Sequence, residues 1–184
     1  MAEINRVTLR MRYFLSLVLA SCLWLVSLWF VFPATASPLS PVVMVLPGLE
    51  GVFRGASPDN LGVDDQGQLA ACPASPNCVV SQQADDTHAI APFTYQSDRE
   101  TARKALLDVL SVVPGATVVA QTEDYIRFEA QSRLLGFVDD GEFYLPADEN
   151  IIHLRSAARL GESDLGVNRR RLEQIRLALK DLGV

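Results

Sequence analysis

The segment from Cys72 to Cys78 carries the residues best suited to chemistry in this chain. Five residues separate the two cysteines, two of them prolines, and His88 follows ten positions after the second cysteine. The prolines favour a turn that brings the two sulfurs within bridging distance. In an exported protein, two nearby thiols more typically form a disulfide than a metal site or a redox pair. We therefore predict a structural Cys72–Cys78 disulfide, provided that the chain is exported.

Catalytic and metal-binding interpretations of the same segment are less favourable. A zinc site made of both cysteines, His88 and Asp85 or Asp86 would need closer cysteine spacing, and the sequence has no second cysteine pair. A redox-active pair more typically has two intervening residues and lies at a helix start. No serine lies in a nucleophile-elbow pattern. His88 is thus a weak catalytic candidate, and we expect neither a metal nor another cofactor.

Acidic and basic side chains gather in the C-terminal half, where two roles suit them. In the first, they form a structural salt-bridge network. In the second, the arginines line an anion site together with exposed helix amides. We favour the network, because a buried arginine is ordinarily paired. In a regular strand Asp140 and Glu142 share one face, and Asp139 points to the other. The candidate residues are Asp139, Asp140, Glu142, Arg155, Arg159, Asp164, Asn168 and Arg169.

Residues 1–36 have the features of an export signal. Three arginines precede an almost wholly apolar run over residues 13–32, and Ala34-Thr35-Ala36 offers a cleavage site. Cleavage after Ala36 is the first interpretation. An uncleaved anchor is the second, because about 20 apolar residues suffice to span a bilayer. Lipidation of Cys22 is the third, and the apolar run that continues after this cysteine argues against it.

Composition restricts the partners of the mature chain. The 184 residues carry a net charge of −6, and removal of residues 1–36 leaves 148 residues with 13 basic and 21 acidic side chains. This length suits one domain with its own core. The acidic balance disfavours nonspecific binding of nucleic acid. We therefore expect a partner protein or a small ligand, with membrane contact through residues 13–32 if they are not cleaved.

The elements expected to position these side chains begin after residue 70. Residues 37–70, rich in proline, glycine and polar residues, are predicted as an extended lead-in to a single domain over residues 71–184. Ser97 and Glu100 form a capping box for a helix that ends at Pro114-Gly115. Hydrophobic patterns then predict four strands and a helix, namely 117–121, 125–131, 137–145, 151–156 and 166–182. The expected fold is a two-layer α+β domain, in which two helices flank a four-stranded antiparallel meander.

Three ordered blocks resemble the domain-of-unknown-function family numbered 1499. They are Cys72 to Cys78 with Ser81-Gln82, Gly136 to Asp140 with Glu142-Phe143, and Arg155 to Gly161 with Ser163 to Arg169. The likeness covers roughly residues 70–182 and implies no particular reaction. Gly141 departs from the apolar residue expected there, and Asp140-Gly141 alone would suit a hairpin turn. Because the family occurs in bacteria and photosynthetic lineages, export implies the periplasm or the thylakoid lumen.

Two functional hypotheses follow. The favoured one is a noncatalytic exported or membrane-anchored domain that binds a partner protein or small ligand at the membrane face. The alternative is a hydrolase or metal-assisted enzyme that uses His88 with nearby acids. The two differ in geometry, because the enzyme requires His88, the cysteines and the strand from Asp139 to Glu142 to meet in one pocket.

Overall fold

The computed structural model describes residues 51–184. The predicted signal or anchor over residues 1–36, with its apolar run 13–32 and Cys22, lies outside the described residues, as do residues 37–50 of the lead-in. Between residues 51 and 184, no helix is both long enough and apolar enough to cross a membrane.

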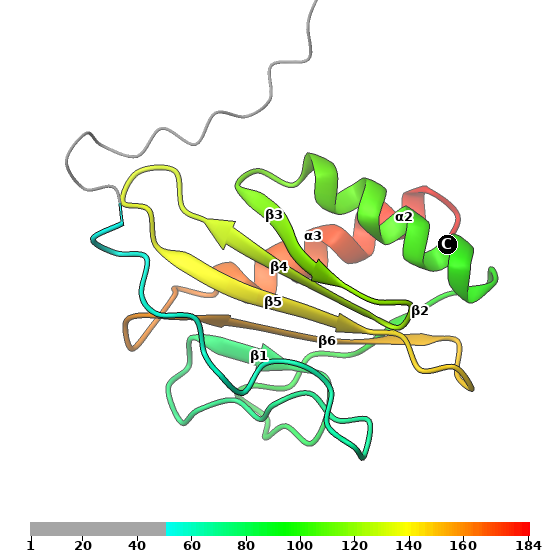
Figure 1. Ribbon diagram of the computed structural model, residues 1–184, viewed down its shortest axis with the longest axis horizontal. Helices are drawn as coiled ribbons and strands as arrows, with labels where there is room; N and C mark the ends of the chain where they lie inside the picture. Colours follow the sequence, from blue (N-terminus) through cyan, green and yellow to red (C-terminus); the bar gives the residue numbers. More distant parts are fainter. Residues whose placement is uncertain (1–50) are drawn as a thin grey trace, which may run out of the picture. The chain divides into compact units, whose positions relative to one another are not determined.

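Two helices and six strands make up an α+β domain (Figure 1). In chain order the elements are β1 (Cys78–Val80), β2 (Phe93–Thr94), α2 (Arg99–Val112), β3 (Ala116–Gln121), β4 (Tyr125–Gln131), β5 (Val138–Tyr144), β6 (Ile151–Ala158) and α3 (Val167–Asp181). Both predicted helices and all four predicted strands are present, and their bounds differ by at most two residues.

The predicted four-stranded sheet is incomplete, because the structure has two further strands. Strands β3 to β6 form the expected antiparallel meander, and the sheet order is β1-β6-β5-β4-β3. β1 pairs with one end of β6, and β2 pairs with the other end. Neither added strand exceeds three residues. Such short strands show no alternating pattern, and their pairing depends on a partner about 60 to 80 residues away in the sequence.

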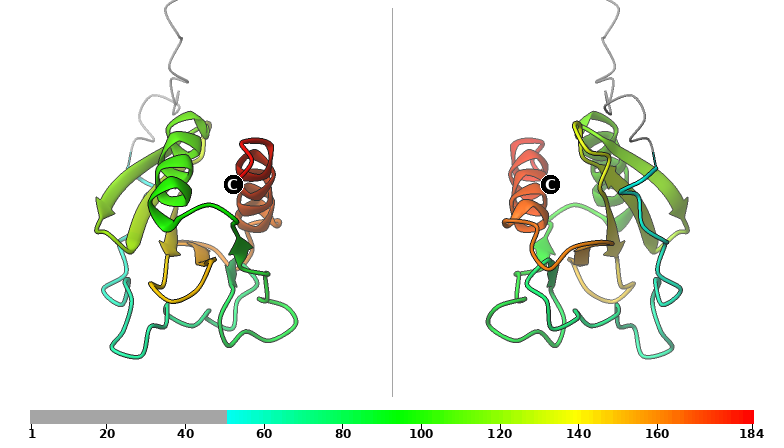
Figure 2. Two further views of the ribbon diagram at one scale, coloured as in Figure 1. Left: turned by 90° about the vertical axis from the view of Figure 1, so that its right-hand side faces the viewer. Right: turned by 90° about the vertical axis from the view of Figure 1, so that its left-hand side faces the viewer.

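Both helices cover the same face of the sheet, where the main core lies (Figure 2). The predicted apolar stripe of α2 includes the buried residues Leu106 and Leu110, and that of α3 includes Leu172 and Ile175. They pack in one cluster with alternate residues of the central strands, namely Ile126, Phe128, Phe143, Ile152 and Leu154. The helix-side face of the sheet is therefore apolar, as expected for one buried side of an antiparallel sheet.

Strand β5 runs unbroken through Gly141, so the alternative hairpin at Asp140-Gly141 does not form. The Phe128 ring of β4 lies directly against this glycine, and a Cβ atom built on Gly141 would lie 2.0 Å from Phe128 Cε1. The ring stacks on Phe143 with 5.5 Å between centroids. Gly141 thus provides room for an aromatic ring, which explains the departure from an apolar side chain.

The helix starts differ from the sequence expectation by small shifts. Asp98, not Ser97, is the N-cap of α2, and its Oδ1 accepts a hydrogen bond from the Thr101 amide at 2.9 Å. A carboxylate suits this position because it also interacts favourably with the positive end of the helix dipole. Before α3, the Asp164 carboxylate accepts from the amides of Gly166 and Asn168.

The chain from residue 51 to residue 77 lies over the opposite face of the sheet. Arg127 of β4 donates to Ser57 Oγ at 2.6 Å, and the Gly62 amide donates to Glu142 of β5 at 2.7 Å. Leu69 is buried, and its amide donates to the Gln82 side chain. The two faces of the sheet are therefore covered by different structures, helices on one side and an irregular segment on the other.

Candidate functional site

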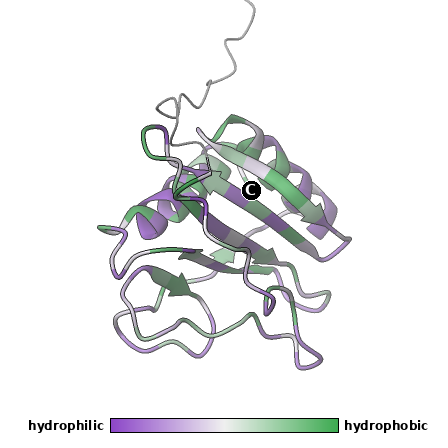
Figure 3. Ribbon diagram, turned by 60° about the vertical axis from the view of Figure 1, so that its left-hand side comes forward, coloured by the Kyte–Doolittle hydropathy of each residue, from purple (hydrophilic) through white to green (hydrophobic). Residues whose placement is uncertain are grey.

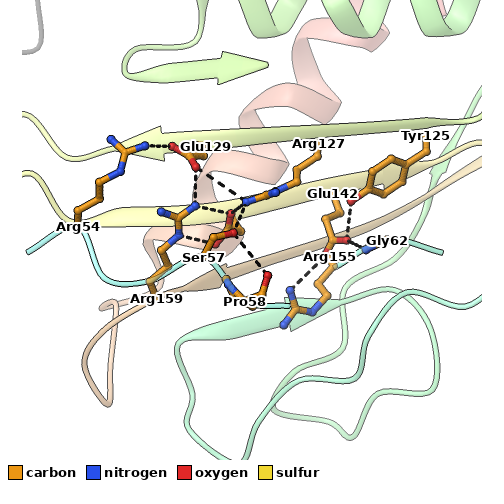
Figure 4. A network of polar contacts seen from close by, with 11 residues as sticks. Arg54, Ser57, Pro58, Gly62, Tyr125, Arg127, Glu129, Glu142, Arg155 and Arg159 are labelled. Atoms are coloured by element: carbon orange, nitrogen blue, oxygen red, sulfur yellow. Dashed lines mark hydrogen bonds and ion pairs between the residues drawn. The ribbon is translucent and has the colours of Figure 1, made fainter. Parts of the chain in front are cut away.

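Charged residues occupy the face of the sheet that the helices leave uncovered. Along β4, β5 and β6, most side chains on this face are polar, with Val138 and Ala157 among the exceptions, while most of the intervening ones enter the apolar core. We call this group the ionic face (Figure 4). Its members are Arg54, Tyr125, Arg127, Glu129, Asp140, Glu142, Arg155 and Arg159. They come from three neighbouring strands, from the residue directly after β6 and from the segment before β1.

Arg159 joins two carboxylates that lie opposite each other on neighbouring strands. Glu129 pairs directly with Asp140 in the sheet register, a position where like charges repel. Arg159 donates through Nε and Nη2 to Asp140 at 2.7 and 2.9 Å, and through Nη2 to Glu129 at 2.5 Å. Arg127 adds a bond to Asp140 at 2.8 Å. The arginines thereby turn a repulsive strand pair into a stable one.

Asp140 and Arg159 are both held in their ionised forms. Burial by itself would raise the pKa of Asp140, but hydrogen bonds from Arg159 and Arg127 outweigh it and lower that pKa below its ordinary value. The bond to Asp140 raises the pKa of Arg159. Asp140 is therefore not positioned to act as a general acid near neutral pH.

Glu142 and Arg155 form a second, more deeply buried ion pair. Their side chains are 0% and 5% exposed, and Arg155 Nη1 lies 3.1 Å from Glu142 Oε2. The other carboxylate oxygen accepts from Tyr125 at 2.8 Å and from the Gly62 amide at 2.7 Å. Burial, and then the nearby Glu142 charge, raise the pKa of Tyr125, so its hydroxyl stays a donor. Glu142 thus has three partners, whereas Arg155 has one ionic partner.

Arg155 lines a pocket of about 340 Å³ beside the ionic face. Its Nε atom is buried and, like Nε of Arg127, has no hydrogen-bond partner among residues 51–184. An unpaired buried donor is costly, so an atom of this kind calls for an explanation. The pocket is lined by Pro58, Asn60, Ala71, Cys72, Pro73, Asp140, Arg155, Ala157, Ala158 and Arg159. One wall therefore comes from the sheet, and the other from the segment that covers it.

The predicted disulfide forms one side of this pocket. Cys72 and Cys78 are bonded, with 5.7 Å between their Cα atoms. Cys78 lies in β1 and pairs with Ala157 of β6, while Cys72 belongs to the covering segment. The disulfide prediction is confirmed, and its location adds a role. The bond ties the irregular wall of the pocket to the sheet wall.

His88 does not join the acidic strand in a pocket. It is buried, its Nδ1 lies 2.9 Å from both Asp85 carboxylate oxygens, and its Nε2 lies 3.2 Å from the Ser75 carbonyl oxygen. The hydrogen bond with Asp85 raises the pKa of His88. Both ring nitrogens are occupied by local partners, and the pocket beside Arg155 contains no histidine. The convergence that the enzyme hypothesis requires is therefore absent from the part of the chain that the structure describes.

The remaining candidate residues lie on the helix side of the sheet. Asp139 points away from Asp140, as predicted for a regular strand, and pairs with Arg171 at 2.6 Å. Asn168 is buried and donates to the Asn77 carbonyl, whereas Arg169 donates to the Thr87 and Ala89 carbonyls. The predicted cluster therefore divides into two groups on opposite faces, and only Asp140, Glu142, Arg155 and Arg159 adjoin the pocket or its ion pairs.

Metal chemistry gains no support from the geometry of residues 51–184. Among them, no group of three or more histidine, cysteine, aspartate or glutamate side chains is placed to hold a metal ion. The zinc set considered from the sequence fails for a chemical reason, because both cysteines are joined in a disulfide and no longer present free thiolates.

Several members of the ionic face were missed by the sequence reasoning. The alternation of Tyr125, Arg127 and Glu129 with apolar residues was visible in the sequence, and it places all three on the face of Asp140 and Glu142 once the strand pairing is known. Arg54 and Asn60 gave no signal, because they lie in the irregular segment and reach the sheet only through tertiary contacts.

A comparison with protein families adds an assignment but no activity. The family model described as "Protein of unknown function (DUF1499)" matches residues 68–179, which is more than half of the chain and includes β1 through most of α3. The match covers the disulfide residue Cys72, the three strands of the ionic face and the sheet wall of the pocket. No curated protein and no solved structure matches the chain. The chain belongs to the DUF1499 family.

Proposed function

We propose that this domain is a noncatalytic binding module that takes a small anion, bearing a carboxylate or phosphate group, in the pocket beside Arg155. The single observation that carries the proposal is the state of the Arg155 guanidinium. It lines the pocket, makes one ion pair and retains a buried Nε without a partner in the described part of the chain. A guanidinium presents its donors as a planar fork that suits carboxylate and phosphate oxygens.

The charge balance around the pocket supports an anionic ligand. The ionic face contains the four arginines 54, 127, 155 and 159 against the three carboxylates 129, 140 and 142, so it carries one excess positive charge in a chain of net charge −6. Asp140 also lines the pocket, but its charge is compensated by Arg159 and Arg127. The excess positive charge therefore lies among Arg54, Arg127 and Arg159, and Arg159 is the one of these three that lines the pocket.

The surroundings of the pocket support a noncatalytic role. No imidazole lines it, Asp140 has a lowered pKa, and Glu142 is engaged by three donors. An enzyme that transfers protons needs a group whose protonation changes near the working pH. Because residues 1–36 have the features of an export signal, we propose that binding takes place outside the cytoplasm, in a periplasm or thylakoid lumen. If residues 13–32 are retained, they anchor the domain to the membrane.

Calorimetric titration of the oxidised protein with inorganic phosphate and with acetate tests the proposal. We expect saturable binding of at least one anion, and a loss of about tenfold or more in affinity for Arg155→Gln, in line with the strength of a charge-assisted hydrogen bond. Arg103→Gln, which removes the same charge from α2 on the other side of the sheet, serves as the matched control and retains the affinity.

A second variant separates loss of the site from loss of the fold. Ala157→Leu enlarges a pocket-lining side chain without touching an ion pair, and it is expected to abolish binding while the circular dichroism spectrum stays native. Absence of saturable binding in the unmodified protein, or equal affinity in Arg155→Gln, would overturn the proposal. Preference for phosphate over acetate, or the reverse, identifies the ligand group.

A further inference from the structure

One end of the sheet exposes large apolar residues on two loops. The first loop joins β4 to β5, and the second joins β6 to α3. We call this surface the leucine end. Its members are Leu134, Leu135, Leu160, Leu165 and Val167. Figure 3 shows hydrophobic colour on the tip of the loop between β4 and β5. Single exposed apolar residues are ordinary, whereas a contiguous exposed group marks an interaction surface.

The two loops are held together around an apolar hollow. A cavity of about 260 Å³ lies between them, and Phe137 and Leu160 contribute walls from opposite sides. Leu165 and Val167 line it as well. Because both loops border one hollow, Leu160, Leu165 and Val167 share a surface with Phe137, and the exposed Leu134 and Leu135 lie just before Phe137 on the first loop.

Leu165 is the most unusual residue of this surface. Its side chain is 83% exposed, and its backbone has a φ of 54°, in the left-handed region that side chains other than glycine and asparagine rarely adopt. Folding gains nothing from an apolar side chain held in solvent in a strained conformation. Such strain occurs preferentially where a side chain must be presented to a partner.

We propose that the leucine end docks on the surface of a lipid bilayer, with Leu134 and Leu165 entering the boundary between headgroups and acyl chains. Two arginines accompany these leucines. Arg133 precedes Leu134, and Arg170 Nη1 donates to the Leu165 carbonyl at 2.6 Å, so a guanidinium lies beside the exposed leucine. The exposed Glu162 and the partly exposed Asp164 lie on the second loop as well, so the surface carries no excess positive charge. The two guanidinium groups suit hydrogen bonding to headgroup phosphates beside the leucines.

The course of the chain favours a bilayer over a protein partner. The described residues begin at Gly51, and the Phe53 ring lies 4.9 Å from the ring of Phe137, which lines the hollow. The chain thus enters the domain at the leucine end. The 20-residue apolar run 13–32, which the sequence assigns first to a cleaved export signal and second to an uncleaved anchor, is separated from Gly51 by 18 residues. In an anchored form of the chain, residue 51 stays within the reach of an 18-residue segment from the bilayer. This inference does not depend on anion binding beside Arg155.

Hydrogen exchange of the full chain with and without vesicles of phosphatidylcholine and phosphatidylglycerol tests this docking. It is informative whether or not residues 1–36 are retained, because it reports on the loops themselves. We expect vesicles to slow exchange in residues 133–136 and 160–167 by about tenfold, the effect of burying one leucine side chain.

The variant Leu134→Ser/Leu165→Asn is expected to lose this protection, and asparagine tolerates the left-handed backbone at residue 165. Leu177→Ser is the matched control, since Leu177 is 59% exposed on α3 and does not line the hollow; it retains the protection. No slowing by vesicles, or equal slowing in the double variant, would overturn the inference. Protection that depends on protein concentration without vesicles would assign this end to self-association and would equally overturn it.

Discussion

The two faces of the sheet bury different kinds of side chain. The helix-covered face contains apolar side chains such as Phe128, Phe143 and Leu154. The opposite face buries Asp140 and Glu142 with arginines under the irregular segment 51–77. Both faces are built from the same three strands, and within each strand successive residues point to opposite faces.

This contrast separates what stabilises the fold from what the fold presents. Apolar burial stabilises a domain without needing particular partners, whereas each buried charge needs a specific partner and often contributes no more than an apolar replacement. A sheet whose only requirement was stability would not need three arginines beneath an irregular segment, with a fourth, Arg54, in that segment. The ionic face is therefore the better place to seek function, and the following predictions test that distinction.

The largest effect is expected from removing half of the deepest ion pair. Glu142→Leu leaves the buried Arg155 guanidinium without its ionic partner, and we expect a loss of about 3–5 kcal/mol in the free energy of unfolding. Replacing both residues, as Glu142→Leu/Arg155→Met, is expected to restore most of this loss because no unpaired charge remains. Tyr125 and Gly62 lose the same acceptor in both variants, so that contribution cancels. Urea unfolding monitored by circular dichroism measures the two values.

The same pair of variants tests whether the ion pair exists for stability. If the double variant is as unstable as Glu142→Leu alone, the ion pair is required for stability. The two faces would then not differ in role, because both would serve to stabilise the fold. If stability returns while phosphate or acetate binding is lost, the pair serves recognition rather than folding.

An intermediate effect is expected on the apolar face. Gly141→Ala places a Cβ atom 2.0 Å from a Phe128 ring atom, and such overpacking costs about 1–3 kcal/mol. Adding Phe128→Leu to this variant should relieve the overlap, so the double variant is expected to be more stable than the sum of the two single losses predicts. Additive losses in urea unfolding would show that the ring and the glycine do not restrict each other.

The sequence predicted the parts of this fold that repeat with a regular period. Both helices, the four-strand meander and the common face of Asp140 and Glu142 follow from the 3.6-residue and two-residue periods of the chain. The disulfide followed from export context and spacing. In each case, local sequence contained the physical cause.

The parts that were missed depend on contacts between distant segments. β1 pairs with β6 across more than 70 residues, and three residues are too few to show a period. Arg54 reaches Glu129 from a segment without regular structure. The pocket beside Arg155 has the same origin, since the Cys72 wall meets the sheet only after the chain has folded.

The smallest effect concerns pH, and it separates the ionic face from the histidines. Between pH 5.5 and 8 the ion pairs of Asp140 should not change the free energy of unfolding, because the pKa of Asp140 is lowered and that of Arg159 is raised. The hydrogen bond with Asp85 raises the pKa of His88, so its stabilisation is complete below the ordinary value of 6.5 and is lost as the pH rises. Burial lowers the pKa of His153, so its contribution is complete above 6.5 and falls as the pH drops. The free energy of unfolding should therefore be highest near pH 6.5. His88→Gln is expected to remove its decrease above this pH, and His153→Gln its decrease below it. A pH dependence that survives both substitutions would show that another group titrates.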